Sequence, residues 1–247
     1  MVSTLSHRGL LNIFDLDQTI KDRHSTRKFL SKPVPRILLD EALALAQLAP
    51  SNSNTQPWRV VFAEGTRRDQ LKKALLKQAQ HFDESQLPKI AQLPEAFQHY
   101  RQELGEQVYG AMGIAREDTA SRERAVLRNY EFFDAPMVGI VCMHRELGDA
   151  DALSVGIYLQ TLMLSLTARG LGTCAQVSLA AYPEIIRSEL NIPPELSILC
   201  GIAVGYTDPD FPPNHLHINR DPVEKNISFL DDLELAHRSD WNTLVRA

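Results

Sequence analysis

The sequence is poor in cysteine. It has three in 247 residues, Cys142, Cys174 and Cys200, which is an odd number with no Cys-x-x-Cys spacing. Such a pattern gives no basis for a disulfide framework. Each cysteine lies in an apolar run, which is typical of buried, reduced thiols. We therefore expect a reducing compartment and predict a cytoplasmic protein.

Segments that would target or anchor the chain are also missing. The first ten residues, MVSTLSHRGL, lack the apolar core and the cleavage signature of a secretory signal. Residues 152–168 are free of charge, but this stretch is at the short end for a bilayer span and contains hydroxyl and amide side chains. A mostly apolar helix with scattered polar groups is more typical of a protein core, so we predict no membrane partner.

Positive charge is not in excess. The chain has 26 Lys and Arg residues against 31 Asp and Glu residues, for a formal net charge of −5, and the basic residues are dispersed. This composition gives no electrostatic reason to expect a nucleic-acid partner. His215 and His217 form a His-x-His pair, but no cysteine or carboxylate set converges on them in the sequence, so no metal is expected.

Glycine-rich phosphate loops are absent as well. No GxxxxGK[ST] motif occurs. GLGTCA, residues 170–175, has the G-x-G-x-x-A spacing of a dinucleotide fingerprint, but that motif needs a strand before it and a helix after it. Here the order is reversed, and Gly170 is better interpreted as the stop of the preceding helix. Any bound phosphate must therefore be held by arginine.

The apolar pattern predicts one α+β domain that spans residues 1–247. Hydrophobic residues make up 44% of the chain, enough for a sizeable core. The pattern favours four or five strands covered by helices, with no internal repeat or linker. Strands are expected at residues 58–63, 135–143, 173–178 and 197–205. Helices are expected at residues 11–21, 36–49, 66–80, 152–170 and 182–190.

Two stretches stand apart from this core. Residues 88–128 are polar and helical with few apolar clusters, and they are open to two interpretations, a lid over a site or a peripheral helical hairpin. Residues 207–247 form a proline-bearing C-terminal extension. Trp58 is predicted to belong to the core rather than to a substrate wall.

Two short segments carry the chemistry. RHSTRKF, residues 23–29, offers two guanidiniums, a hydroxyl and an imidazole, which suit a phosphate because guanidinium donates in bidentate fashion. PSNSNTQPW, residues 50–58, offers neutral hydroxyl and amide groups that suit the edge of a heteroaromatic ring. Each segment alone could be an ordinary surface turn. Together they predict a site for a phosphorylated heterocycle.

These two segments, with RGLGTCAQVS, ILCGIAVGY and Arg220, resemble the nitroreductase family of FMN-dependent oxidoreductases. Around FFDAP, residues 132–136, and LGTCAQV the chain is most similar to nitroreductases that act on nitrobenzoate-type aromatics. The resemblance implies a three-layer sandwich with a mostly antiparallel sheet, an obligate homodimer, bound FMN and NAD(P)H as co-substrate.

The resemblance also implies residue roles. Arg23, Ser25 and Arg220 would hold the FMN phosphate, with His24 contributing through its backbone. Arg27 would lie near N1 and O2 of the isoalloxazine, where a cation stabilises the charge of the reduced ring.

Two further sets would contact the ring. The other subunit would contribute Pro50, Ser51, Asn52 and Asn54. The strand end with Ala175, Gln176, Val177 and Ser178 would pass the ring edge, with a backbone N–H directed at N5. Family members often have an acidic residue and a glycine where this chain has Val177 and Ser178, which leaves that side-chain contact open. Ser51, Asn52 and Gln176 could instead only satisfy local backbone groups.

The implied reaction is ping-pong hydride transfer from NAD(P)H to a flat, electron-poor acceptor such as a nitroaromatic or a quinone. The flavin carries the chemistry, so no side-chain nucleophile or acid–base dyad is needed. Two alternatives remain open, a reductive dehalogenase and a non-catalytic FMN-binding sensor or accessory protein. Against the first, no lysine lies between Lys89 and Lys225 to grip an amino-acid substrate. The sequence does not decide whether NADH or NADPH is preferred, which acceptor is used, or whether one or two electrons are transferred at a time.

Overall fold

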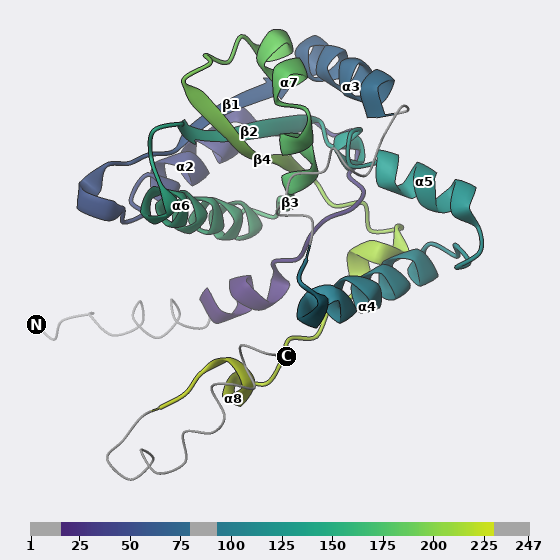
Figure 1. The fold of residues 1–247 in the computed structure, drawn as a ribbon. Coiled ribbons are helices and arrows are strands. Elements are labelled where there is room, and N and C mark those ends of the chain that lie inside the picture. Colours follow the sequence, from purple (N-terminus) through teal and green to yellow (C-terminus); the bar gives the residue numbers. More distant parts are fainter. Residues whose placement is uncertain (1–15, 80–92, 230–247) are drawn as a thin grey trace, which may run out of the picture.

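A computed structural model describes residues 16–79 and 93–229 of the chain. Its centre is a sheet of four strands, β1 (Arg59–Glu64), β2 (Met137–His144), β3 (Gly172–Gln176) and β4 (Leu196–Gly205). The strand order is β1-β2-β4-β3, and every neighbouring pair is antiparallel. The prediction of an α+β fold with a mostly antiparallel sheet is confirmed (Figure 1).

Helices cover both faces of this sheet (Figure 1). The helices of eight or more residues are α2 (Arg36–Ala46), α3 (Gly65–Ala79), α4 (Glu95–Ala111), α5 (Thr119–Leu127), α6 (Asp149–Thr167) and α7 (Pro183–Leu190). A short helix, α8 (Val223–Asn226), follows near the C-terminus. Residues 16–22 are also helical, and residues 11–15 of the helix expected there lie outside the described residues.

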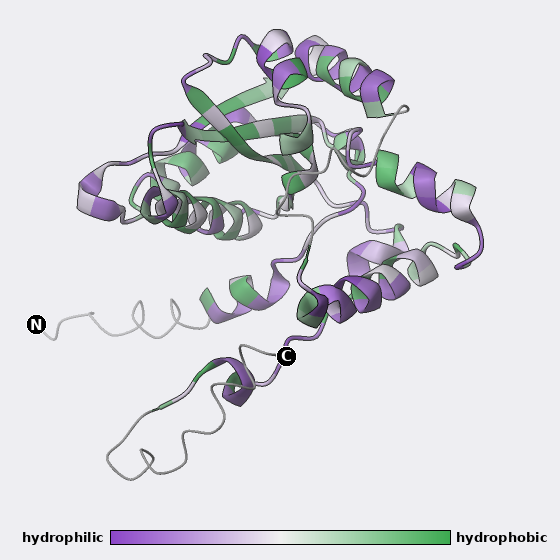
Figure 2. Ribbon diagram, in the orientation of Figure 1, coloured by the Kyte–Doolittle hydropathy of each residue, from purple (hydrophilic) through white to green (hydrophobic). Residues whose placement is uncertain are grey.

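The strands separate two apolar clusters. Val138 and Ile140 of β2 belong to the cluster that includes α3 and α7, whereas Met137 and Val141 belong to the cluster that includes α2 and α6. This alternation follows from the period of two in a strand, which sends successive side chains to opposite faces. The result is the expected three-layer arrangement, and green apolar residues concentrate on the sheet in Figure 2.

The charge-free stretch 152–168 is a core helix, as predicted. Val155, Tyr158, Leu162 and Leu166 of α6 are buried in the cluster with α2. Tyr158 stacks on Trp58 with ring centroids 4.8 Å apart, which places Trp58 in the core as expected. Within the described ranges, no helix is long and apolar enough to cross a membrane.

Gly170 ends α6, as the sequence suggested. Its φ is +72°, in the left-handed region that glycine adopts without a steric penalty. The N–H of Gly170 donates to Thr167 O, and the N–H of Leu171 donates to Leu166 O. These two bonds are the pattern of a Schellman motif.

Some expected boundaries were wrong by a few residues. The strand expected to reach Ser178 ends at Gln176, because Val177–Ala181 turns into a 3-10 helix. The helix expected to reach Ala49 ends at Ala46 and continues as a turn before Pro50. The helix expected to begin at Thr66 begins at Gly65, whose φ is +53°.

Candidate functional site

Residues 23–29 lie along the edge of the sheet formed by β3. Ser25 forms a parallel bridge with Thr173, and the N–H of Thr26 donates to Thr173 O at 2.9 Å. Farther along, Phe29 forms an antiparallel bridge with Thr207. An edge strand offers backbone donors and acceptors to whatever lies beside it. The basic segment therefore has a fixed place against β3 rather than being a solvated turn.

Gly172 makes this close approach possible. A Cβ built on Gly172 would overlap both Thr26 Oγ1 and Thr207 Oγ1. Those two hydroxyls lie 3.2 Å apart and hydrogen-bond to each other. Three segments that are far apart in the sequence thus meet at Gly172, a position of β3 that has no side chain.

The side chains of Arg23, Ser25 and Arg27 lie on the side of β3 where the thiol of Cys174 is buried, near enough to act on its pKa. Burial raises the pKa of the Cys174 thiol to about 11, and Arg27, Ser25 and Arg23 each oppose that increase. Only groups that lie close to the sulfur act on it in this way. The thiol stays protonated at neutral pH and is not a nucleophile. The structure thus brings together the two guanidiniums and the hydroxyl that the sequence singled out.

The end of β3 next to this cluster alternates in exposure. Ala175 and Val177 are exposed, whereas Gln176 is only 2% exposed. Gln176 Nε2 donates to Asn129 O at 2.7 Å, so this side chain is a buried amide paired with backbone. Its Oε1, and Ser178 Oγ, are buried without a described partner. The Nε2 atom of His24 is also buried without a described partner, whereas its Nδ1 donates to Asp22 O.

Residues 50–54 lie elsewhere on the same chain. The N–H of Asn52 donates to Ser154 Oγ, at the beginning of α6. β3 follows the other end of α6, whose 19 residues span about 28 Å at about 1.5 Å per residue. Figure 1 shows the two segments beyond opposite ends of that helix. One chain therefore does not bring Pro50, Ser51, Asn52 and Asn54 to Arg23 and Arg27.

The 50–54 turn is held by its own groups. Ser51 Oγ accepts the N–H of Gln56 at 3.0 Å. Ser53, Asn54 and Gln56 have φ values of 47°, 57° and 46°, a left-handed conformation that is uncommon for residues with side chains. Such strain persists where the surroundings determine it, and it clusters at functional sites.

Arg220 lies in the segment that leaves the domain toward α8. It is exposed, and its Nη1 donates to the carbonyls of Ile218 and Asn219. The neighbouring Asp221 accepts from Tyr100 of α4 and pairs with Lys225 at 3.1 Å. Hydrogen bonding from Tyr100 and Lys225 lowers the pKa of Asp221. In the described parts of the chain, no contact joins Arg220 to Arg23 or Ser25.

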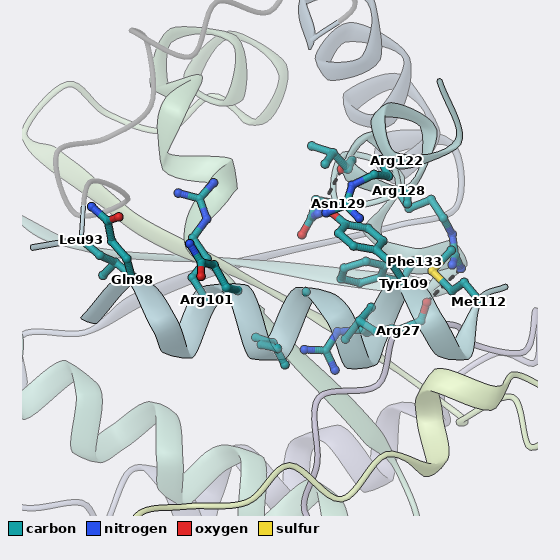
Figure 3. A pocket seen from close by; sticks show the side chains of 16 residues that line it. Arg27, Leu93, Gln98, Arg101, Tyr109, Met112, Arg122, Arg128, Asn129 and Phe133 are labelled. Atoms are coloured by element: carbon teal, nitrogen blue, oxygen red, sulfur yellow. Dashed lines mark hydrogen bonds between the residues drawn. The ribbon is translucent and has the colours of Figure 1, made fainter. Parts of the chain in front are cut away.

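A cavity of about 900 Å³ opens beside Arg27. Its walls come from α4 and α5, from Phe133 and Asn129, and from Arg27 itself. Figure 3 shows Arg122, Arg128, Tyr109 and Phe133 toward one end of it, with Arg101 and Gln98 farther along α4. Helices from the 88–128 stretch thus form the walls of a cavity that reaches the basic segment.

Known proteins are similar to this chain over most of its length. The model of the nitroreductase family matches residues 20–206. The chain belongs to the nitroreductase family. It is 36% identical to a 4-nitrobenzoate reductase of Pseudomonas putida, over 87% of this chain and 96% of that protein. It is 33% identical to a nitrobenzene nitroreductase of Ectopseudomonas oleovorans, over 88% of this chain and 97% of that protein.

A solved relative shares the fold closely. The FMN-dependent nitroreductase NfnB of Mycobacterium smegmatis, in complex with NADPH, superposes with a TM-score of 0.81 at 31% identity, over 89% of this chain and all of that one. The expected membership of the family is therefore confirmed, and this nitroreductase has FMN- and NADPH-dependent homologues.

Several residues that shape the candidate site were not found from the sequence. Asn214 accepts the N–H of Arg27 at 2.7 Å, and Arg128 Nη2 donates to Arg27 O at 2.9 Å. Thr26 and Thr173 fix the basic segment on β3. Thr26 stands inside RHSTRKF, where its position between two cations was a usable signal. No sequence signal pointed to Asn214 or Arg128, because both are distant from Arg27 in the sequence and contact it only in the folded chain.

Metal ligation is not supported in the part of the nitroreductase that the structure describes. No group of three or more His, Cys, Asp or Glu side chains there could hold an ion. His215 Nε2 instead hydrogen-bonds Pro209 O at 2.6 Å.

Proposed function

We propose that this nitroreductase uses FMN and NAD(P)H to reduce flat, electron-poor aromatic acceptors such as nitroaromatics or quinones, by a ping-pong mechanism. One observation carries the proposal. Arg27 belongs both to the basic segment fixed on β3 and to the wall of the cavity between α4 and α5. A cofactor held by that segment would therefore present its ring to the cavity.

The residues present fit FMN. Arg23 and Ser25 offer a charged and a neutral donor for the phosphate, and Arg27 offers a second guanidinium for the ring. Ala175 and Val177 are exposed residues beside this segment, and their backbone groups could pair with the ring heteroatoms. Buried acceptors without a described partner, Gln176 Oε1 and Ser178 Oγ, lie in the same segment.

Arg220 would be a further cation for the phosphate. It is exposed, and it lies six residues after Asn214, which binds the N–H of Arg27. His24 would act through its backbone because its ring is tied to Asp22 O.

When bound, FMN would supply the redox chemistry by accepting hydride from NAD(P)H and giving it to the acceptor. The net reaction for a nitroaromatic is ArNO₂ + NAD(P)H + H⁺ → ArNO + NAD(P)⁺ + H₂O, with the proton from solvent. The contribution of the chain is position and charge. Arg27 would stabilise negative charge on the ring, and the apolar side chains of Phe133, Val108 and Met112 would exclude water from a flat substrate.

A homodimer would complete the site. Leu153 and Leu48 are 69% and 79% exposed, and Leu45 and Ile157 are also exposed on α2 and α6. Apolar side chains exposed on adjacent helices are typical of an interface. Because residues 50–54 lie beyond the end of the same helix pair, a second copy could carry Pro50, Ser51, Asn52 and Asn54 to the ring.

The test is a titration followed by an anaerobic reduction. The protein is loaded with FMN, and NADH or NADPH is added without oxygen. We expect bleaching of the flavin absorbance, and its recovery on addition of a nitroaromatic or a quinone. Stable yellow colour would indicate a binding protein, and halide release from a halogenated aromatic would indicate a dehalogenase. Failure to take up FMN would refute the proposal. The relatives are named for neutral and for anionic nitroaromatics, so they do not decide the acceptor.

A further inference from the structure

The cavity between α4 and α5 is strongly and unequally charged. Four arginines line it, Arg27, Arg101, Arg122 and Arg128, and no Asp or Glu does so among the described residues. The chain as a whole has a formal net charge of −5. Positive charge is therefore concentrated in this one concavity, where low-dielectric walls focus the field.

Arg27 and Arg128 have structural roles. Arg27 Nη1 donates to Ser25 O at 3.1 Å. Arg128 Nη2 donates to Arg27 O, its guanidinium lies 4.6 Å from the ring centroid of Phe211, and Asp134 lies 4.0 Å away. Burial lowers the pKa of Arg128, and Asp134 and Glu131 oppose that effect. Arg128 thus connects α5 with the basic segment and has its charge partly balanced.

Arg122 is placed differently. Its guanidinium carbon lies 4.1 Å from the ring centroid of Tyr109, a cation–π contact between α5 and α4. No described carboxylate pairs with it within 4 Å, whereas ten other ion pairs occur in the described chain. A guanidinium that stacks by its face keeps its edge N–H groups for a planar bidentate partner. A carboxylate has that geometry.

The remaining walls suit an aromatic ring. Val108, Met112, Val126 and Phe133 are apolar, and Gln98 and Asn129 add neutral hydrogen-bonding groups. A ligand that satisfies the whole cavity is flat and apolar with an anionic end.

We propose that the acceptor of this nitroreductase is an aromatic carboxylate, whose carboxylate binds Arg122 where Arg122 stacks on Tyr109. The inference rests on the proposed function and names the substrate class of that site. The 2′-phosphate of NADPH is another anion that Arg122 could bind. The experiment distinguishes this phosphate from the carboxylate of the acceptor.

The experiment uses the FMN-loaded enzyme and two acceptors that differ only in charge, 4-nitrobenzoate and its methyl ester. The wild-type enzyme should favour 4-nitrobenzoate in kcat/KM. Arg122→Gln should lower kcat/KM for 4-nitrobenzoate at least tenfold, mainly through KM, and change the value for the ester less than twofold. The matched control is Arg124→Gln, since Arg124 lies on the same helix, donates to Ser121 Oγ and does not line this cavity.

A binding measurement removes any dependence on turnover. Benzoate, which cannot be reduced here, should bind the wild type and Arg124→Gln equally in calorimetry and Arg122→Gln at least tenfold more weakly. Arg122→Lys should recover only part of the affinity, because an ammonium keeps the charge but loses the planar fork.

Three results would overturn the inference. One is equal loss of activity toward both acceptors, which would make Arg122 a structural residue. Another is a wild-type enzyme without preference for the charged acceptor; such an enzyme would keep the proposed function and lose only this inference. The third is slower flavin reduction of Arg122→Gln by NADPH, unchanged reduction by NADH, and normal benzoate binding, which would assign the cation to the 2′-phosphate.

Discussion

The side chain of Asn214 holds the backbone of Arg27, although 187 positions separate the two residues. Its Oδ1 accepts the N–H of Arg27 at 2.7 Å, and its Nδ2 donates to the carbonyls of Lys28 and Asp208. Asn214 is 4% exposed, so these backbone groups have no ready access to water. One amide therefore fixes the place of the guanidinium that we assign to the flavin ring.

Replacement of Asn214 should release that guanidinium. Asn214→Ala leaves the N–H of Arg27 and the carbonyl of Asp208 without a described partner, whereas Lys28 O still accepts the N–H of Asp208. Each unsatisfied buried group costs about 1–3 kcal/mol. We expect lower stability and weaker FMN binding, measured by denaturant unfolding and by flavin titration. Asn214→Asp, which keeps the acceptor and loses the donors, should be intermediate. Asn219→Ala, at an exposed position nearby, is the control. Normal FMN affinity in Asn214→Ala would contradict the role.

Gly172→Ala tests the close approach of three segments. A methyl group there would overlap the hydroxyls of Thr26 and Thr207 and push the basic segment away from β3. Overpacking of this kind costs about 1–3 kcal/mol, and FMN affinity should fall with it. Gly110→Ala in α4 is the control, because nothing lies within 4 Å of its Cβ and alanine favours a helix by up to about 1 kcal/mol. The same Tm for both variants would refute the steric argument.

Local patterns predicted the parts of the fold that depend on neighbours in sequence. The apolar runs of β2 and β4, the helical stop at Gly170 and the core position of Trp58 all follow from residue type and spacing. Phe132, Phe133 and Asp134 show the limit. All three have positive φ, between 55° and 66°. None of the three is glycine or asparagine, the residues that usually indicate such a conformation in a sequence.

Local sequence patterns predicted only some residues of the candidate site. Arg23, Ser25 and Arg27 could be found because one short segment contains them. Arg122 and Arg124 look equivalent in the sequence, yet only Arg122 lines the cavity. Which face of α5 meets α4 is decided by tertiary packing, and Asn214 reaches Arg27 for the same reason.

Arg27→Ala should slow the reduction of the bound flavin more than it weakens the binding of FMN. If the guanidinium stabilises the reduced ring, its loss should slow flavin reduction by NAD(P)H at least tenfold, which corresponds to about 1.4 kcal/mol, and lower the flavin midpoint potential. The FMN dissociation constant should change less. Arg116→Ala is the control, since that side chain is 81% exposed and pairs only weakly with Glu106. Equal reduction rates in Arg27→Ala and wild type would remove the assigned role.

A charge on the exposed face of α6 should separate the proposed dimer. Leu153→Asp would bury a carboxylate in an apolar interface, so we expect a monomer in sedimentation velocity and loss of FMN, because residues 50–54 of the partner would be absent. Dilution of the wild type should release FMN in parallel with dissociation. Lys73→Asp, exposed on α3 across the sheet, should remain dimeric and yellow. A monomeric Leu153→Asp protein that keeps its FMN would contradict a shared site.

Stability should fall at alkaline pH because the thiols are buried. Burial raises the pKa of Cys142 and of Cys174 from 9.0 to about 11, and that of Cys200 to about 12. Between pH 9 and 11 the unfolded chain has released protons that the folded chain still holds, so the free energy of unfolding decreases as pH rises. Each pKa unit corresponds to about 1.4 kcal/mol. The variant with Cys142→Ala, Cys174→Ala and Cys200→Ala should lose less Tm between pH 8 and 10.5 than the wild type, and parallel curves for the two proteins would show that the thiols do not titrate with unfolding.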